Sequence, residues 1–454
     1  MKLQRKYIYL LLFFIAIALV ELFDLFQLLF ALDQGKSIAL SILIIAAFLW
    51  VTEWVPLFIT SMIILLLQLC WLLPVINPAA GKIERQVYLS PFFSDIILLF
   101  LGGFVLAAML HKYGLDNRIA SWLLKKTGTK PSRILMGIML VSAILSMWMS
   151  NTATTAMMFA IILPIVDKIP KENRFSLALL LGIPFACNLG GLGTPIGTPP
   201  NAIAMSFLAE KGLSISFFGW MLAAVPLMLV LLVVVWFLLL KFYAPGDLEI
   251  QFEEKSSDEF SAAHWLVIGL FFVTVLGWLT TKTHGFSLGT VSLIPVIFTF
   301  GVGLLTTRDF KNLPWDVLFM VGGGICLGVG LRDSGLTKEM IGLIPTHISY
   351  LWVLVAFLCL TALMTTFMSN TATANLLIPI AVSTDFDILM FVIPIAMVCS
   401  TAMALPISTP PNAIAFGSGL LESKDMMKPG AVITIISILI IIALGLFYLP
   451  QLGL

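Results

Sequence analysis

The chain has 454 residues, of which 60% are hydrophobic and 11% are charged, and its formal net charge is +1. Soluble domains carry charge on about 25% of their residues, so this composition excludes a soluble globular protein. We expect an all-α polytopic membrane protein, because helices satisfy their own backbone hydrogen bonds inside a bilayer. A net charge of +1 identifies no acidic partner, and we expect the lipid bilayer as a partner but no nucleic acid and no cofactor.

Eleven apolar runs are candidate membrane-spanning helices, many of them near the ~20 residues that a bilayer requires. They cover residues 8–32, 37–50, 55–73, 94–111, 176–194, 217–240, 264–281, 287–305, 316–331, 388–407 and 431–449. The first run is too long for a signal peptide and contains Glu21 and Asp24, so we expect a retained span. Two longer apolar stretches, 133–165 and 349–380, are interrupted by polar residues, and we expect each to form a re-entrant helical hairpin.

The distribution of basic residues predicts the orientation under the positive-inside rule. With the N-terminus in the cytoplasm and the C-terminus outside, all but seven of the 25 Lys and Arg residues fall on the cytoplasmic side. The seven predicted to lie outside are Lys36, Lys82, Arg85, Lys211, Lys282, Arg332 and Lys338. The acidic segment 244–263, which contains Asp247, Glu249, Glu253, Glu254, Asp258 and Glu259, is most simply a solvated connector between two halves.

Three landmarks occur twice along the chain. The phrase SNTAT stands at 150–154 and 369–373, TPPNAIA follows at 198–204 and 409–415, and residues 95–115 align with 316–336. The offsets of 219, 211 and 221 residues are nearly constant, which indicates an internal duplication. Because an odd number of predicted crossings separates the copies, we expect an inverted-topology repeat with a substrate site near the membrane midplane, between the halves.

Each SNTAT phrase carries the residue types that begin helices. Ser, Asn and Thr are preferred N-caps, and a helix that starts inside the membrane presents free N–H groups and the positive end of its dipole. Two such starts, at Ser150 and Ser369, would bind a solute with two carboxylates. In the plainer alternative, the hydroxyls bond back to helix carbonyls and each Asn joins neighbouring helices; finding the phrase twice argues against it.

The TPPN phrases predict unwound helix. The first contains Gly190, Gly191, Gly193, Pro195, Gly197, Pro199 and Pro200 in or beside it, and the second has Pro406, Pro410 and Pro411. Unwound backbone at membrane depth exposes carbonyl oxygens, which are suitable ligands for a hard cation such as sodium. A hydroxyl stands one helical turn before each SNTAT serine, at Ser146 and Thr365. Alternatively, these Gly and Pro residues are only packing kinks.

The SNTAT and TPPN phrases contain no Lys or Arg, so helix N-termini and bound cations would have to compensate a dianion there. Cation coupling is therefore expected. The charged residues nearest the apolar runs, Glu53, Arg332 and Asp333, could line a pathway, but we favour the reading in which they mark the ends of spans.

The paired SNT and TPPN motifs, with the TEWVP phrase at 52–56, resemble the divalent anion/sodium symporter family, which includes the INDY proteins. The resemblance covers essentially the whole chain. It implies an elevator-type homodimer in the plasma (bacterial inner) membrane. The implied scaffold parts are residues 1–131 and 241–345, and the implied transport parts are residues 132–240 and 346–454.

The resemblance also implies site residues. Those expected to hold the substrate carboxylates are Ser150, Asn151, Thr152, Ser369, Asn370 and Thr371, with Thr198, Thr409 and Pro410. One sodium ion is expected among Ser146, Ser150, Asn151 and Gly197, and a second among Thr365, Met368, Asn370 and Ser408. The implied substrates are four- and five-carbon dicarboxylates such as succinate, malate, fumarate and 2-oxoglutarate, and citrate in some members.

Three alternatives remain open from the sequence. Some members of the family exchange dicarboxylates without net sodium movement, and the SNT motifs do not exclude that mode. An intramembrane enzyme would need Ser150 or Ser369 as a nucleophile, but neither motif contains a His, Lys or carboxylate that could act as its base. A channel is disfavoured because two broken helices suit alternating access better than a continuous pore.

Overall fold

The computed structural model describes residues 2–170, 172–246, 248, 260–342, 348–384 and 386–452. Every regular element within these residues is a helix, as expected of a polytopic membrane protein. The acidic residues predicted to form the connector, Asp247, Glu249, Glu253, Glu254, Asp258 and Glu259, lie outside the described residues. So does the predicted boundary at residue 345.

Nine helical segments in the described residues are long and apolar enough to cross a membrane. They are α3 (Gln34–Thr52), α4 to α5 (Leu57–Ile76), α6 to α7 (Lys82–Lys112), α11 (Phe175–Leu192), α13 (Phe217–Phe242), α14 (Ala262–Leu279), α18 (Trp315–Asp333), α20 (Tyr350–Phe367) and α24 (Ser423–Phe447). Four shorter apolar helices are α9 (Pro131–Ser146), α10 (Asn151–Val166), α16 (Leu288–Gly301) and α22 (Ile388–Cys399). The remaining α-helices are α1 (Lys2–Leu22), α2 (Leu25–Phe30), α8 (Leu115–Lys125), α12 (Pro199–Glu210), α15 (Thr281–His284), α17 (Thr307–Lys311), α19 (Leu336–Gly342), α21 (Asn370–Ala381) and α23 (Pro410–Gly417).

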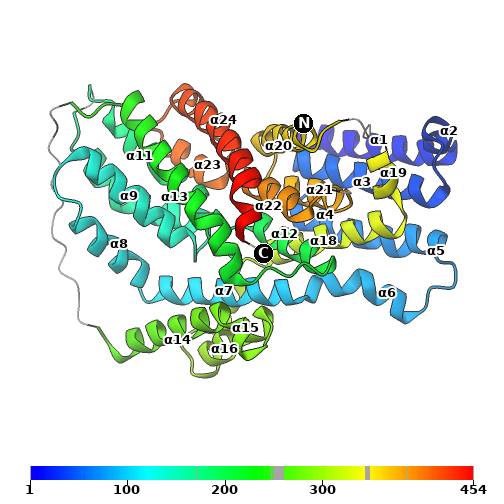
Figure 1. The fold of residues 1–454 in the computed structure, drawn as a ribbon, viewed down its shortest axis with the longest axis horizontal. Helices are drawn as coiled ribbons and strands as arrows, with labels where there is room; N and C mark the ends of the chain where they lie inside the picture. Colours follow the sequence, from blue (N-terminus) through cyan, green and yellow to red (C-terminus); the bar gives the residue numbers. More distant parts are fainter. Residues whose placement is uncertain are drawn as a thin grey trace.

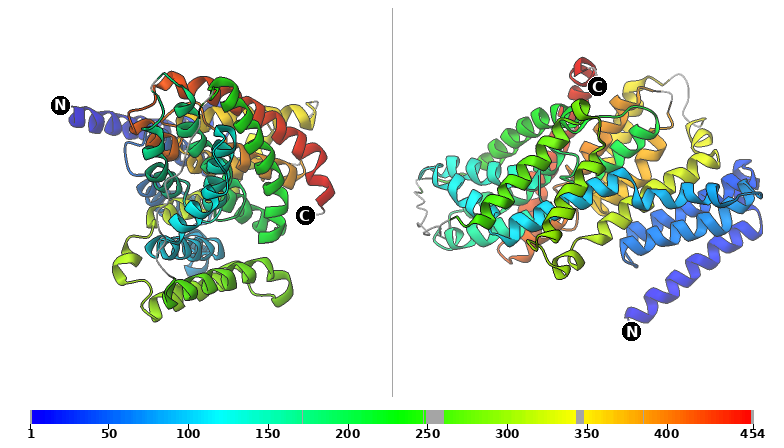
Figure 2. Two further views of the ribbon diagram at one scale, coloured as in Figure 1. Left: turned by 90° about the vertical axis from the view of Figure 1, so that its left-hand side faces the viewer. Right: turned by 90° about the horizontal axis from the view of Figure 1, so that it is seen from below.

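The prediction that residues 8–32 form one membrane-spanning helix was wrong, because this run contains the end of α1 and the whole of α2. The run 8–32 breaks at Phe23 and Asp24, where Asp24 has a φ of 49° and accepts a hydrogen bond of 2.7 Å from the Gln27 side chain. A left-handed residue interrupts the helical hydrogen bonds, so α1 ends at Leu22 and the short α2 follows at an angle. Figure 2 shows α1 projecting from the body towards the N-terminus.

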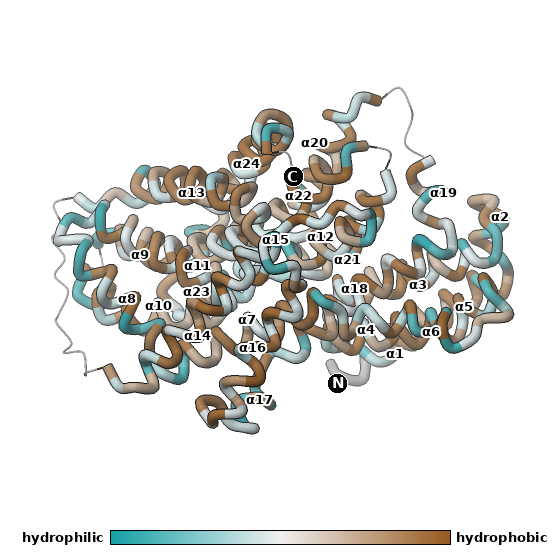
Figure 3. The backbone as a smooth tube through the Cα atoms, turned by 60° about the horizontal axis from the view of Figure 1, so that its bottom comes forward, coloured by the Kyte–Doolittle hydropathy of each residue, from teal (hydrophilic) through white to brown (hydrophobic). Residues whose placement is uncertain are grey.

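The helices form an elongated body (Figure 1). One end holds α3 to α6 with α18, which packs against α4, and the other end holds α8 to α11 with α13. The segment α6 to α7 runs along one edge of both ends, and α16 packs on α7 from outside. Hydrophobic residues follow most of the helical length, whereas hydrophilic segments gather at helix ends and connections (Figure 3).

Four ion pairs between described residues join distant segments of the chain: Lys36 with Glu339, Lys112 with Asp309, Arg174 with Asp425, and Arg332 with Glu210. The positive-inside count assigns only basic residues to a side of the membrane. In each pair, the acidic partner stands next to a basic residue that the count assigns to the same side as the basic partner. The predicted grouping of helix ends is therefore consistent with the fold, because charged side chains cannot pair across the bilayer. Which group faces the cytoplasm stays a prediction.

Replacing Asp309 by Asn is expected to lower the unfolding temperature slightly at pH 7, with a difference from the unaltered protein that shrinks below about pH 4. The Lys112 ammonium, 2.7 Å away, lowers the pKa of Asp309 from its ordinary 3.8 to about 2. Because the pKa of Asp309 is lower in the folded protein than in the unfolded chain, the carboxylate stabilises the fold at pH values above 3.8. This stabilisation is lost as the pH falls towards 2. Thermal unfolding of both proteins at pH 7, 5 and 3 measures this, and a difference that grows on acidification would contradict it.

Candidate solute and cation site

Both SNTAT phrases begin a helix inside a helix–turn–helix unit, as predicted. The first hairpin joins α9 to α10, and the second joins α20 to α21. Ser150 and Ser369 have extended backbone, and their Oγ atoms accept the Ala153 and Ala372 N–H groups at 3.2 Å. The N-cap interpretation is therefore confirmed at both positions, and each cap leaves further first-turn N–H groups without a partner in the helix.

The hydroxyl one turn before each SNT motif contacts the motif asparagine. Ser146 Oγ lies 2.6 Å from Asn151 Oδ1, and Thr365 Oγ1 lies 2.7 Å from Asn370 Oδ1. Each hydroxyl also contacts a carbonyl of the next helix. We call these two sets, each made of a hydroxyl, an asparagine and a carbonyl, the polar triads.

The third members of the triads are backbone carbonyls that sequence reasoning missed. Ser146 Oγ lies 2.9 Å from the Cys187 carbonyl, and Thr365 Oγ1 lies 2.7 Å from the Cys399 carbonyl. The two cysteines are equivalent positions of the repeat, so the duplication extends to atomic contacts. Any residue type can supply a backbone carbonyl, so the sequence does not mark such a ligand directly. The presence of a cysteine at this place in both copies of the repeat was the one signal that could have identified it.

The first triad fits a hard cation. The Asn151 Oδ1 position lies 2.6 Å from Ser146 Oγ, 3.2 Å from the Cys187 carbonyl and 3.3 Å from the Gly197 carbonyl. If the amide is reversed, its nitrogen donates to all three of these oxygens. When Oδ1 of Asn151 occupies this position, the surrounding ligands are all oxygen atoms, which suits sodium. When the amide is reversed, its nitrogen donates hydrogen bonds to the same oxygens and no ion is needed.

The structure brings together only part of each predicted sodium set. Ser146, Asn151 and Gly197 meet in the first, while the Ser150 hydroxyl is occupied as a helix cap. In the second, Thr365 and Asn370 meet, and Ser408 Oγ donates to the carbonyl of Thr366, the residue next to Thr365. Met368 is buried at the end of α20, and its assignment as a carbonyl ligand stays a prediction.

Both TPPN phrases follow a non-helical segment, as predicted. α11 ends at Leu192 and α12 begins at Pro199, and α22 ends at Cys399 while α23 begins at Pro410. The predicted extent of the first break was wrong at both ends. Gly190 and Gly191 still belong to α11, and Pro199 and Pro200 occupy the first turn of α12, where proline is tolerated because no intrahelical donor is needed.

The asparagines of the TPPN phrases hold the unwound segments in place, a role that sequence reasoning missed. Asn201 Nδ2 donates to the Gly191 and Thr194 carbonyls at 2.9 and 2.8 Å, and Asn412 Nδ2 donates to the Leu405 carbonyl at 3.1 Å. These side chains satisfy carbonyls that the broken helices leave free. The signal that could have predicted this role is that the asparagine occupies the same position in both TPPN phrases.

The predicted substrate residues are exposed unequally in the two repeats. Ser150 and Thr152 are exposed and Asn151 is half-buried, whereas Ser369 and Asn370 are half-buried. Thr371, Thr198 and Thr409 are 5%, 3% and 2% exposed, and Pro410 is exposed. The first hairpin tip is therefore the more open of the two.

The hairpins interlock the two repeats. α10 of the first hairpin packs against α23, which follows the second unwound segment, and α21 of the second hairpin packs against α12, which follows the first. Each hairpin helix thus lies against the helix that follows the unwound segment of the other copy. Whether the two helix starts approach closely enough to hold one solute stays a prediction.

The charged residues near the apolar runs lie at helix ends. Glu53 is the residue after α3, and Arg332 and Asp333 are the last two residues of α18. This placement agrees with the reading in which they mark the ends of spans. In the described part of the chain, no three His, Cys, Asp or Glu side chains are grouped as a metal site.

Comparison with known proteins identifies relatives along most of the chain. A family model described as "Citrate transporter" matches residues 47–387. An uncharacterized transporter of Schizosaccharomyces pombe is 31% identical over 93% of this chain, which spans about half (51%) of that relative. The sodium-dependent dicarboxylate transporter SdcS of Staphylococcus saprophyticus is 32% identical over 92% of this chain and 87% of its own length. SdcS of Staphylococcus aureus strain USA300 is 32% identical over 88% and 84%.

The helical architecture, the duplicated motifs and these matches agree with one another. The chain is an integral membrane transporter and not an enzyme. It belongs to the citrate transporter family and, with its sodium-dependent dicarboxylate transporter relatives, to the divalent anion/sodium symporters.

Proposed function

We propose that the protein is a secondary active transporter of four- and five-carbon dicarboxylates, such as succinate, malate, fumarate and 2-oxoglutarate, coupled to sodium in the plasma membrane. Its relatives named sodium-dependent dicarboxylate transporters support the solute class. The observation that carries the proposal is the duplicated polar triad beside a capped helix start. One such unit fits one carboxylate and one cation, so two units suit a dicarboxylate.

The chemistry of the site follows from the charges involved. Free N–H groups and dipoles at the starts of α10 and α21 attract carboxylates, but each helix terminus supplies only about half an elementary charge. A dianion therefore needs further positive charge, and sodium ions at the triads would provide it. In this proposal the SNT residues, Thr198, Thr409 and Pro410 contact the solute, and the sodium sets are those expected from the sequence.

A sodium-independent dicarboxylate exchanger is the second candidate. One observation favours it: with its amide reversed, Asn151 satisfies Ser146, Cys187 and Gly197 through hydrogen bonds and needs no cation. An intact triad is thus compatible with both modes, and transport measurements have to separate them.

Uptake of radiolabelled succinate into proteoliposomes tests the proposal. A symporter takes up label into empty vesicles when an inward sodium gradient is applied, and not when potassium replaces sodium. An exchanger takes up label without sodium, provided that the vesicles are preloaded with unlabelled succinate. Absence of uptake of succinate, malate and 2-oxoglutarate in both formats would contradict dicarboxylate transport.

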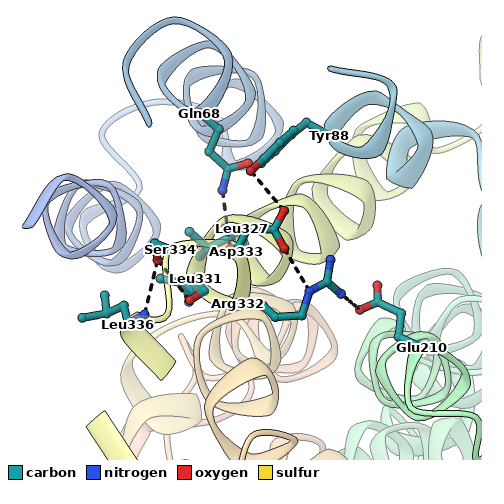
Figure 4. A network of polar contacts seen from close by, with 9 residues as sticks. All are labelled: Gln68, Tyr88, Glu210, Leu327, Leu331, Arg332, Asp333, Ser334 and Leu336. Carbon is teal, nitrogen blue, oxygen red and sulfur yellow. Dashed lines mark hydrogen bonds and ion pairs between the residues drawn. The ribbon is translucent and has the colours of Figure 1, made fainter. Parts of the chain in front are cut away.

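We also propose that the protein works as a homodimeric elevator, in which residues 132–240 and 346–454 move against residues 1–131 and 241–345. One of the four long-range ion pairs crosses this division (Figure 4). Arg332 at the end of α18 bonds Glu210 at the end of α12 at 2.9 Å, and it also bonds Asp333, which accepts from Tyr88. A partly exposed pair of this kind contributes roughly 0–1 kcal/mol, so it can break in each cycle.

Crosslinking Glu210→Cys to Arg332→Cys with a short bifunctional thiol reagent is expected to abolish uptake, because the bond would tie a moving part to a fixed one. Uptake of labelled succinate before and after crosslinking, in a background without the native cysteines, measures the effect. The matched control is Lys112→Cys with Asp309→Cys, a pair that lies within the scaffold parts and should keep its uptake when crosslinked. Full uptake by the crosslinked Glu210 and Arg332 variant would contradict the proposed division.

A further inference from the structure

Asn188 lies near the C-terminal end of α11 and links the first repeat to the second. Its side chain is fully buried, and its Nδ2 donates to Thr409 Oγ1 at 3.1 Å and to Asn412 Oδ1 at 3.3 Å. The residue before it, Cys187, supplies the carbonyl of the first polar triad. This short stretch of α11 therefore contacts the first triad on one side and the second TPPN phrase on the other.

The hydrogen-bond network fixes the orientation of the Asn188 amide. Asn412 Nδ2 donates to the Leu405 carbonyl, which can only accept, so Asn412 must turn its Oδ1 towards Asn188. Asn188 can meet that oxygen only with its N–H₂ group. Its second N–H then points at Thr409 Oγ1.

This arrangement determines what the Thr409 hydroxyl can do. Its oxygen accepts one hydrogen bond from Asn188 Nδ2 and a second, at 3.3 Å, from the Asn412 backbone N–H. A hydroxyl oxygen accepts two hydrogen bonds and donates one. With both acceptor positions used, Thr409 can only donate, and no described group accepts its proton. A donor without an acceptor at this place is what an anionic solute requires.

We propose that Asn188 is a positioning residue that turns the Thr409 hydroxyl into a fixed donor to a substrate carboxylate. The inference rests on the proposed function, because Thr409 is taken there as a substrate contact. Asn188 does not itself need to touch the substrate. Its Oδ1 is buried without a described partner, so the hydrogen bonds printed for its side chain are the two that it donates to Thr409 and Asn412.

The hydrogen-bond arrangement around Thr409 has no counterpart around Thr198 in the first TPPN phrase. The position equivalent to Asn188 in the second copy is Ser400, which follows Cys399 as Asn188 follows Cys187. Ser400 Oγ is buried without a described partner, and Thr198, the counterpart of Thr409, has no side-chain cap hydrogen bond. The two halves of the site are therefore unequal, with the prearranged donor in the half that contains Thr409.

Binding of radiolabelled succinate to the purified full-length protein, in sodium, tests the proposal with four variants: Asn188→Ala, Asn188→Ser, Thr409→Val, and Asn188→Ala with Thr409→Val. We expect Asn188→Ala to weaken binding about tenfold, which is the usual effect of losing one hydrogen bond to a charged group. Asn188→Ser, which keeps a shorter donor, should recover part of the loss. The double variant should bind no more weakly than Thr409→Val alone, because Asn188 acts through Thr409.

The outcomes separate this inference from the proposed function. Losses that multiply in the double variant, or unchanged affinity of Asn188→Ala, would overturn the role of Asn188 while leaving dicarboxylate binding intact. Failure of the unaltered protein to bind succinate, malate or 2-oxoglutarate would overturn both. The exposed Asn117→Ala serves as the control that keeps normal affinity, and unfolding temperatures of all variants show that each one is folded.

Discussion

A variant carrying both Asn151→Ala and Asn370→Ala is expected to show no succinate uptake above background. Each asparagine is a member of a polar triad, lying 2.6 to 2.7 Å from its hydroxyl, and begins the helix whose N-terminus would attract a carboxylate. Removing both deletes one amide ligand from each proposed cation set. Initial rates of labelled uptake into proteoliposomes with a sodium gradient measure the loss.

The same variant should remain folded. Both asparagines are only half-buried, and each lost hydrogen bond costs roughly 0.5–1.5 kcal/mol, which a protein of this size tolerates. The matched control replaces two exposed asparagines, Asn117→Ala with Asn312→Ala, and should keep full uptake. Normal uptake by the Asn151 and Asn370 variant would show that the triads are structural and would remove the site assignment.

Gly190→Ala is expected to destabilise the protein and to distort the first triad. A Cβ at Gly190 would lie 2.3 Å from the backbone oxygen of Ala143 and 2.6 Å from its Cα, so α9 and α11 would have to move apart. Overpacking of this kind costs roughly 1–3 kcal/mol. The displacement would also separate Ser146 on α9 from the Cys187 carbonyl on α11, so sodium-driven uptake should fall more than stability alone explains.

Gly269→Ala is the matched control for that substitution. Gly269 also lies within an apolar helix, α14, but no heavy atom beyond the adjoining backbone of that helix lies within 4 Å of a Cβ added there. Alanine in an open helical position is neutral or stabilises by up to about 1 kcal/mol. Comparison of unfolding temperatures and uptake for the two variants tests the argument, and equal behaviour would contradict a tight contact between α9 and α11.

Local chemistry explains what could be predicted from the sequence. Ser150 and Ser369 cap helices because a Ser side chain reaches the N–H groups of the next turn, an interaction decided within a few residues. Pro199 and Pro410 begin helices for an equally local reason, because they lack the N–H that a helix interior needs. The predictions of hairpin starts and helix breaks depended on such short-range effects.

What could not be predicted depends on contacts between distant segments. The Cys187 and Cys399 carbonyls belong to the backbone, which is the same for every residue type, and only the fold shows which carbonyl meets a given hydroxyl. In the sequence, Asn188 is one polar residue within an apolar run. Only the packing of α11 against α23 shows that its side chain bonds Thr409. The break at Asp24 was missed because apolar character continues on both sides of it.

The interlocking of α10 with α23 and of α21 with α12 has a consequence for how the protein is made. When the ribosome has released the first hairpin into the bilayer, its packing partner α23 has not yet been synthesised, because it lies near the end of the chain. Until α23 is made, the part of α10 that packs against it stays uncovered, and incompletely packed intermediates of this kind are prone to misfolding. We therefore expect a premature stop in the second half to destabilise the first half as well.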